Sequence, residues 1–213
     1  MKKIGLLIPK TNLTVEYELQ MLFSKGYFDN KKSVFYTFKL NYKTSYKENK
    51  SKFLEELAMD INNKKRDSAY LGIDYNAFFC TTSAIENMVE EINPTVSLIE
   101  ESKLRNIKKC LLITPYNNKL GREIVSVLED HEIKVVKNIN LDLVCTTDYF
   151  NYGFNKLENL IKENYLDEYG NIIISCTNLP TISVIESLEN KLNTQIVSSN
   201  SSLFAKIKRD NNI

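Results

Sequence analysis

The chain has 213 residues, of which 43% are hydrophobic and 26% charged, and its formal net charge is +1. This is the composition of a folded globular protein, and the near-zero charge gives no general attraction to nucleic acid or to an anionic membrane. No apolar run approaches the ~20 residues that span a bilayer. The N-terminus also lacks the apolar length and cleavage site of a signal peptide. We therefore expect a cytoplasmic protein that binds neither nucleic acid nor membrane.

Short apolar runs alternate with helix-like stretches, which predicts an α/β fold with parallel sheets built from βαβ units. Strands are expected near residues 3–8, 33–39, 75–79, 108–113, 133–138, 171–175 and 195–198. Helices are expected near residues 13–25, 50–65, 84–91, 97–105, 117–131, 154–166, 181–191 and 200–208. The stretches 40–50 and 139–153 are predicted loops, which either cover a site or simply run through solvent.

The two halves of the chain carry matching motifs. Residues 75–86 and 171–182 each contain an apolar run, then Cys-Thr, then residues typical of a helix start. Residues 6–12 and 111–117 open the two halves in a similar way. We therefore predict an N-terminal half over 1–106 and a C-terminal half over 107–194, with 195–213 packing back on the first half.

The repeated cysteines lie where ligands usually bind in a parallel sheet, at the carboxyl end of a strand. Ser83 and Glu86 fit a capping box after Cys80, and Asn178 fits a helix N-cap after Cys176. A helix N-terminus favours a thiolate and holds nearby anions. Either cysteine alone would be an ordinary buried strand-end residue, but their repetition favours two reactive thiols facing one cleft.

Two further residues follow strands at the openings of the halves. Asn12 can cap the next helix or donate its amide to a carboxylate. Tyr116 occupies the matching turn of the second half, where it can bind a carboxylate or pack at the junction. Cys110 is expected to be a buried small hydrophobe, and Cys145 is given no role.

Several common sites are missing from the sequence. The four cysteines and the single histidine, His131, lack zinc-ligand spacing, and the six glycines form neither G-x-G-x-x-G nor a P-loop. We therefore expect no metal and no nucleotide cofactor, and acid–base chemistry must rest on cysteine, carboxylate or tyrosine side chains.

The chain resembles the Asp/Glu racemase superfamily, and within it the maleate cis–trans isomerase and arylmalonate decarboxylase branch. Four motifs carry the resemblance in chain order, at residues 5–16, 79–83, 113–116 and 175–180. It implies two pseudo-symmetric flavodoxin-like (Rossmann-like) α/β domains with the active site between them. It also implies a cofactor-independent reaction on a small carboxylate, and we expect a homodimer.

The resemblance also implies roles for individual residues. Cys80 would be the nucleophile and Cys176 its partner, while Asn12 and Tyr116 would hold the carboxylates of the substrate. The other expected substrate-binding residues are Thr11, Thr81, Thr82, Thr177 and Asn178. Two departures bear on the substrate: a second substrate-binding Asn has no clear place in residues 140–147, and the segment 93–108 is short for the family.

Three functions remain open from the sequence. The first is cis–trans isomerisation of a maleate-like dicarboxylate; the presence of both cysteines favours an isomerase or a racemase over a decarboxylase. The alternative is an aspartate/glutamate-type racemase with two-thiol proton transfer, although racemases usually carry Cys-Asn-Thr where this chain has Cys-Thr-Thr. The third is a non-catalytic carboxylate-binding protein, against which two intact cysteines argue.

Overall fold

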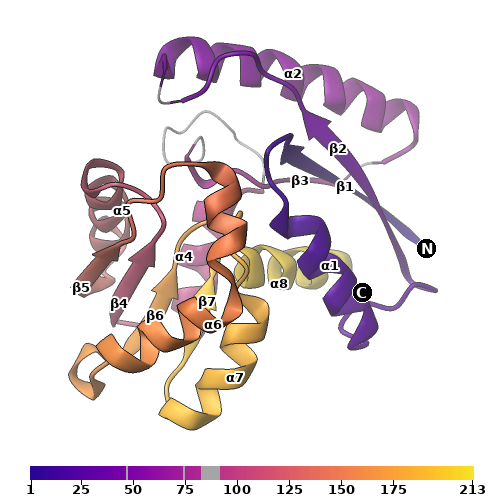
Figure 1. Cartoon of the computed structure of the whole chain (residues 1–213). Helices are drawn as coiled ribbons and strands as arrows, with labels where there is room; N and C mark the ends of the chain where they lie inside the picture. Colours follow the sequence, from indigo (N-terminus) through magenta and orange to yellow (C-terminus); the bar gives the residue numbers. More distant parts are fainter. Residues whose placement is uncertain (47, 74, 83–91) are drawn as a thin grey trace.

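The computed structural model describes residues 1–46, 48–73, 75–82 and 92–213. It contains two parallel sheets (Figure 1). The first has the strand order β2-β1-β3, formed by β1 (Lys2–Pro9), β2 (Ser33–Leu40) and β3 (Tyr75–Phe78). The second has the order β5-β4-β6-β7, formed by β4 (Lys109–Thr114), β5 (Lys134–Asn140), β6 (Asn171–Ile174) and β7 (Ile196–Ser198). The predicted α/β class with two parallel sheets is confirmed.

Helices flank both sheets (Figure 1). They are α1 (Thr14–Ser24), α2 (Lys50–Tyr70), α4 (Pro94–Leu104), α5 (Asn118–Asp130), α6 (Thr146–Asn164), α7 (Ile182–Leu192) and α8 (Ser199–Asn211), with a 3₁₀ turn η1 (Asp167–Tyr169). The central strands are apolar without alternation because both faces of the sheet are covered, so that Leu6, Leu7 and Ile8 are all fully buried. The predicted capping box at Ser83 and Glu86 and the expected helix near 84–91 lie outside the described residues.

Two helices start earlier than expected because of local caps. At the start of α6, the Asp148 carboxylate accepts a hydrogen bond from the backbone N–H of Cys145 at 2.9 Å. Asn93 accepts hydrogen bonds from the backbone N–H groups of Thr95 and Val96, so α4 starts at Pro94. In the stretch 139–153, β5 runs to Asn140 and α6 begins at Thr146. The predicted loop is therefore wrong except for residues 141–145. A break remains inside α6 at Gly153, where φ is 68°.

The C-terminal stretch 195–213 contributes to both halves. Strand β7 pairs with β6 in the second sheet. The apolar face of α8, including Leu203 and Phe204, instead joins the cluster that contains Ile4 and Leu6 of β1. The boundaries at 106 and 194 stay a prediction.

The buried carboxylate of Glu18, in the first half, forms hydrogen bonds with the second half. Glu18 of α1 is fully buried and accepts hydrogen bonds from the backbone N–H groups of Thr181 and Ile182, at the start of α7. Asn200 of α8 donates its side-chain amide to the other carboxylate oxygen, at 2.6 Å. Burial raises the pKa of Glu18, and these donated hydrogen bonds oppose that rise. An acidic side chain of one half thus caps a helix of the other.

Across the described ranges, none of the helices combines the length and the apolar character needed to cross a membrane.

Candidate active site

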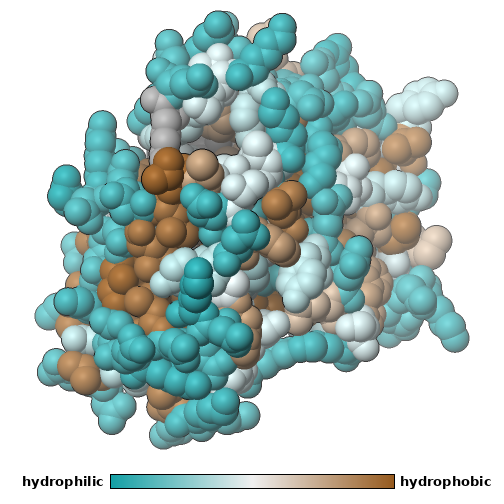
Figure 2. All heavy atoms as spheres, in the orientation of Figure 1, coloured by the Kyte–Doolittle hydropathy of each residue, from teal (hydrophilic) through white to brown (hydrophobic). Residues whose placement is uncertain are grey.

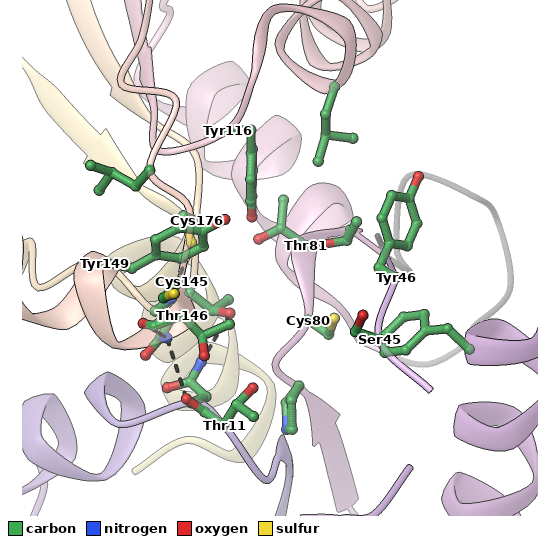
Figure 3. Close-up of a pocket in the computed structure, with 18 of the residues that line it drawn as sticks. Thr11, Ser45, Tyr46, Cys80, Thr81, Tyr116, Cys145, Thr146, Tyr149 and Cys176 are labelled. Carbon is green, nitrogen blue, oxygen red and sulfur yellow. Dashed lines mark hydrogen bonds between the residues drawn. The ribbon is translucent and has the colours of Figure 1, made fainter. Parts of the chain in front are cut away.

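A cavity of about 690 Å³ lies between the two halves, at the carboxyl ends of the strands (Figure 3). Strands β1, β3, β4 and β6 each deliver a predicted residue to it directly after the strand ends. All the predicted site residues line this one cavity: Thr11, Asn12, Cys80, Thr81, Thr82, Tyr116, Cys176, Thr177 and Asn178. The structure therefore brings the predicted set together, while their chemical roles stay predictions.

Thr177 ties the loop of one cysteine to the loop of the other. Its hydroxyl donates to the backbone oxygen of Phe79 at 3.1 Å and accepts from Asn12 Nδ2 at 3.2 Å. Because Phe79 precedes Cys80 and Thr177 follows Cys176, this pair of hydrogen bonds holds the two cysteine-bearing chain segments side by side.

Asn12 caps a helix and also has an amide group that can donate hydrogen bonds in the cavity. Its Oδ1 accepts from the backbone N–H groups of Thr14 and Val15, at 2.9 and 3.1 Å, and so caps the first turn of α1. Its Nδ2 donates one hydrogen to Thr177. Since an amide carries two N–H groups, the second remains for a ligand in the cavity.

Asn178 is not the N-cap of α7, and that prediction is wrong. The helix begins at Ile182 with Thr181 as its cap, because a turn follows Cys176. The Asn178 side chain points toward α1 instead, accepting from the Leu13 N–H at 2.8 Å and from the Thr14 hydroxyl at 3.2 Å. Its Nδ2 donates to the backbone oxygens of Thr11 and Thr146. The side chain thus uses its full hydrogen-bonding capacity to join three segments around the cavity.

Cys176 is a buried thiol with a raised pKa. Burial raises its pKa to about 11, and charge on Cys80 acts in the same direction. Hydrogen bonds from the Tyr116 hydroxyl and from the backbone N–H groups of Asn178 and Leu179 oppose this rise. The expectation that a helix N-terminus makes Cys176 a thiolate is wrong, because the sulfur is buried and no helix starts there. Near neutral pH Cys176 is a protonated thiol.

Tyr116 is a proton donor facing the same space. Burial raises its pKa well above the usual value, and the nearby thiols Cys176 and Cys80 add to that effect. The ring packs edge-on against Tyr149, with ring centroids 6.0 Å apart. In Figure 3 the hydroxyl end of the Tyr116 side chain points toward Thr81.

Cys80 is buried where β3 gives way to the helical residues Thr81 and Thr82. The Thr81 hydroxyl is buried and, among the described residues, has no hydrogen-bond partner. A buried hydroxyl at a cavity wall costs free energy unless a ligand satisfies it. Thr81 is therefore well placed to bind a polar group of a substrate.

Two tyrosines in the wall were missed from the sequence. Tyr42 hydrogen-bonds Thr11 at 2.9 Å and lies close enough to Cys80 for the thiol charge to raise its pKa, after burial as the larger cause. Tyr149 lies on α6 beside Cys176. The aromatic character of the stretch 40–50 was a usable signal for Tyr42, whereas Tyr149 sits in no motif.

The remaining cysteines differ sharply. Cys110 is fully buried, as expected for a small hydrophobe, and burial raises its pKa to about 12. Cys145 is exposed and lines the cavity at the start of α6, although no role was expected for it. All four cysteines lie in the described ranges, and none forms a disulfide.

Asn140 forms hydrogen bonds within the fold and does not line the cavity. It accepts from the Thr114 hydroxyl at 2.8 Å and donates to Asn118 at 3.1 Å. It also lies against Gly121, where an added Cβ would come within 2.1 Å of its Oδ1. The cavity wall after β5 consists instead of Leu143, Val144, Cys145 and Thr146. Within the described ranges, no three His, Cys, Asp or Glu side chains converge as a metal site would require.

No protein-family model and no curated protein matches the chain. Solved structures do match it over nearly its whole length. The maleate isomerase Iso from Pseudomonas putida has a TM-score of 0.82 and 16% identity, with 100% of this chain and 93% of that chain covered. A Cys-to-Ser variant of the Nocardia farcinica maleate cis–trans isomerase, with a covalently bound succinylcysteine intermediate, has a TM-score of 0.83 and 16% identity over 98% and 91% of the two chains.

A structure of unliganded arylmalonate decarboxylase is also similar, with a TM-score of 0.70 and 14% identity over 98% and 92% of the two chains. At these identities the likeness establishes the fold. The chain therefore has the fold of the maleate isomerases and of arylmalonate decarboxylase, as its four motifs predicted.

Proposed function

We propose that the chain is a cofactor-independent cis–trans isomerase of a small unsaturated dicarboxylate of the maleate type. The observation that carries the proposal is the pair of thiols, Cys80 and Cys176, that line one cavity. Cys80 directly precedes the helical residues Thr81 and Thr82, and the burial of Cys176 raises its pKa to about 11, which favours the protonated thiol near neutral pH. The fold shared with the maleate isomerases supports it.

The reaction balances with these residues alone. The Cys80 sulfur, as a thiolate, adds to one alkene carbon, and the π electrons move to the neighbouring carbon and its carboxylate. The former double bond is then a single bond and rotates. Elimination returns the electrons to the C–C bond, reforms the alkene in the trans geometry and releases the thiolate.

The other residues stabilise the anion formed in between. Tyr116 and Thr81 place hydroxyl groups at the cavity wall. Asn12 donates one amide hydrogen to Thr177, and within the described ranges its second amide hydrogen has no partner, so that it can bind a carboxylate. Cys176 holds a proton beside them, which it can share with the carbanion carbon or return. Thr177 and Asn178 position the two cysteine loops, because their side chains bond protein groups.

A two-thiol racemase is the second candidate, because the same pair of thiols could take and give an α-proton on opposite faces of an amino acid. We further propose that a small carboxylate is the only partner in the site, with no cofactor, and that the chain acts as a homodimer in the cytoplasm. The net charge of +1 supports the absence of nucleic acid and membrane partners.

The test is turnover of maleate, followed by the change in absorbance of the conjugated double bond. Cys80→Ser should abolish turnover, because a serine alkoxide is hardly available near neutral pH. Cys176→Ser should impair turnover severely, because a serine hydroxyl is a far weaker acid than a thiol and gives its proton to the carbanion less readily. Cys110→Ala is the matched control, since that thiol lies at the opposite, amino end of β4. Solvent deuterium uptake into D- and L-aspartate or glutamate, without maleate turnover, would favour the racemase instead.

A further inference from the structure

We infer that the substrate is bulkier than maleate: an unsaturated dicarboxylate that carries an apolar substituent, such as an aryl or alkyl group, on its double bond. This inference rests on the proposed function and names the substrate class of the same cavity.

The cavity is much larger than maleate. Maleate has eight non-hydrogen atoms, and even if each took the volume of a water molecule in the liquid, the whole would fill about 240 Å³. The cavity measures about 690 Å³, which lies in the range of pockets that enclose much larger ligands. Well over half of the space is therefore left once the two carboxylates and the double bond are in place.

The wall of the cavity combines polar groups near the two cysteines with apolar side chains elsewhere. The hydroxyls, amides and thiols that suit carboxylates gather around Cys80 and Cys176. The rest of the wall includes Phe53, Leu120, Leu143 and Val144, with the ring of Tyr46. Figure 2 shows apolar surface over the connection from β5 to α6, which carries two of these residues. An apolar group placed against this wall would be removed from water at about 25 cal/mol per Å².

The charged residues described in the wall do not suit a further charged group on the substrate. Lys119 and Glu123 both line the cavity and lie one turn apart on α5, so the negative charge of the glutamate offsets the positive charge of the lysine. Lys50 is the other cation among the described residues of the wall, and its ammonium lies 5.9 Å from the centre of the Tyr46 ring. The described part of this rim therefore offers no concentrated positive charge for a phosphate or a third carboxylate. A neutral apolar substituent fits the wall better.

The test compares maleate, methylmaleate and phenylmaleate as substrates. We expect kcat/KM to rise along this series, by about tenfold or more from maleate to phenylmaleate. Two variants change the apolar wall: Val144→Trp fills it from an exposed position, and Leu143→Ala removes surface from it. Both should lower the phenylmaleate-to-maleate ratio of kcat/KM, whereas the control Val136→Trp, exposed on β5 away from the cavity, should not change it.

Binding of unreactive analogues separates this inference from the proposed function. Phenylsuccinate should raise the melting temperature of the protein more than succinate at equal concentration. If none of the three alkenes is isomerised, the proposed function fails, and the analogue comparison still tests the pocket. Maleate as the preferred substrate, or equal stabilisation by the two succinates, would overturn the inference.

Discussion

Replacing Thr177 by valine tests the contact that holds the two cysteine loops together. Valine has nearly the shape of threonine but cannot hydrogen-bond, so the Phe79 carbonyl and one N–H of Asn12 lose their partner. Thr177 is only 4% exposed, which leaves little access for water to replace these bonds. Each buried polar group left unpaired costs about 1–3 kcal/mol, and the extra buried methyl returns roughly 0.8 kcal/mol.

Thr177→Val should therefore lower the free energy of unfolding by about 1–5 kcal/mol, measured by urea denaturation. Turnover at a temperature where the variant is still folded should fall as well, because the spacing between the two thiols is no longer fixed. Thr37→Val on β2 is the control, since that threonine is exposed and the same exchange should change stability by less than about 0.5 kcal/mol. If Thr177→Val and Thr37→Val lowered the free energy of unfolding equally, the proposed role of the Thr177 hydrogen bonds in joining the two cysteine loops would be refuted.

Three further predictions concern groups around the site. Glu18→Gln should lower the free energy of unfolding by about 1–3 kcal/mol in urea denaturation, because the NH₂ group of glutamine would face the N–H donors that now bond the carboxylate. The control Glu16→Gln breaks an exposed ion pair with Lys39 and should lower it by less than about 1 kcal/mol. Tyr116→Phe should raise the pKa of Cys176 further, seen as a later rise of thiolate absorbance on alkaline titration; an unchanged curve would count against the hydrogen bond. Because the pKa of Cys176 is raised from 9.0 to about 11, its contribution to stability is complete below pH 9 and is lost between pH 9 and 11. The wild type should thus lose about 2–3 kcal/mol more than Cys176→Ser over that interval, and parallel losses would contradict the shift.

Sequence reasoning located the strands well because their signal is local. Each is a short apolar run in a sheet buried on both faces, so Leu6–Ile8 or Ile172–Ile174 cannot be mistaken for exposed chain. The same reasoning found the cavity residues, since the carboxyl ends of parallel strands converge wherever the helices lie.

The errors arose where a tertiary contact decided the outcome. Asn178 has the sequence position of an N-cap, but its side chain bonds α1 and the Thr146 carbonyl, which are distant in the sequence. The raised pKa of the Cys176 thiol results from burial in the folded protein, and no local sequence pattern reports how deeply a residue is buried. Tyr149 reaches the cavity only because α6 starts at Thr146, eight residues before the predicted start.

In the proposed reaction, Cys80 adds covalently to an electron-poor double bond. The most direct measurement is mass spectrometry of Cys176→Ser protein incubated with maleate, and separately with phenylmaleate, followed by digestion and peptide mapping. We predict a thioether adduct of the substrate on Cys80, absent from the Cys80→Ser/Cys176→Ser double variant. An adduct only on Cys145, or turnover of either alkene by a protein that lacks the Cys80 thiol, would contradict the account.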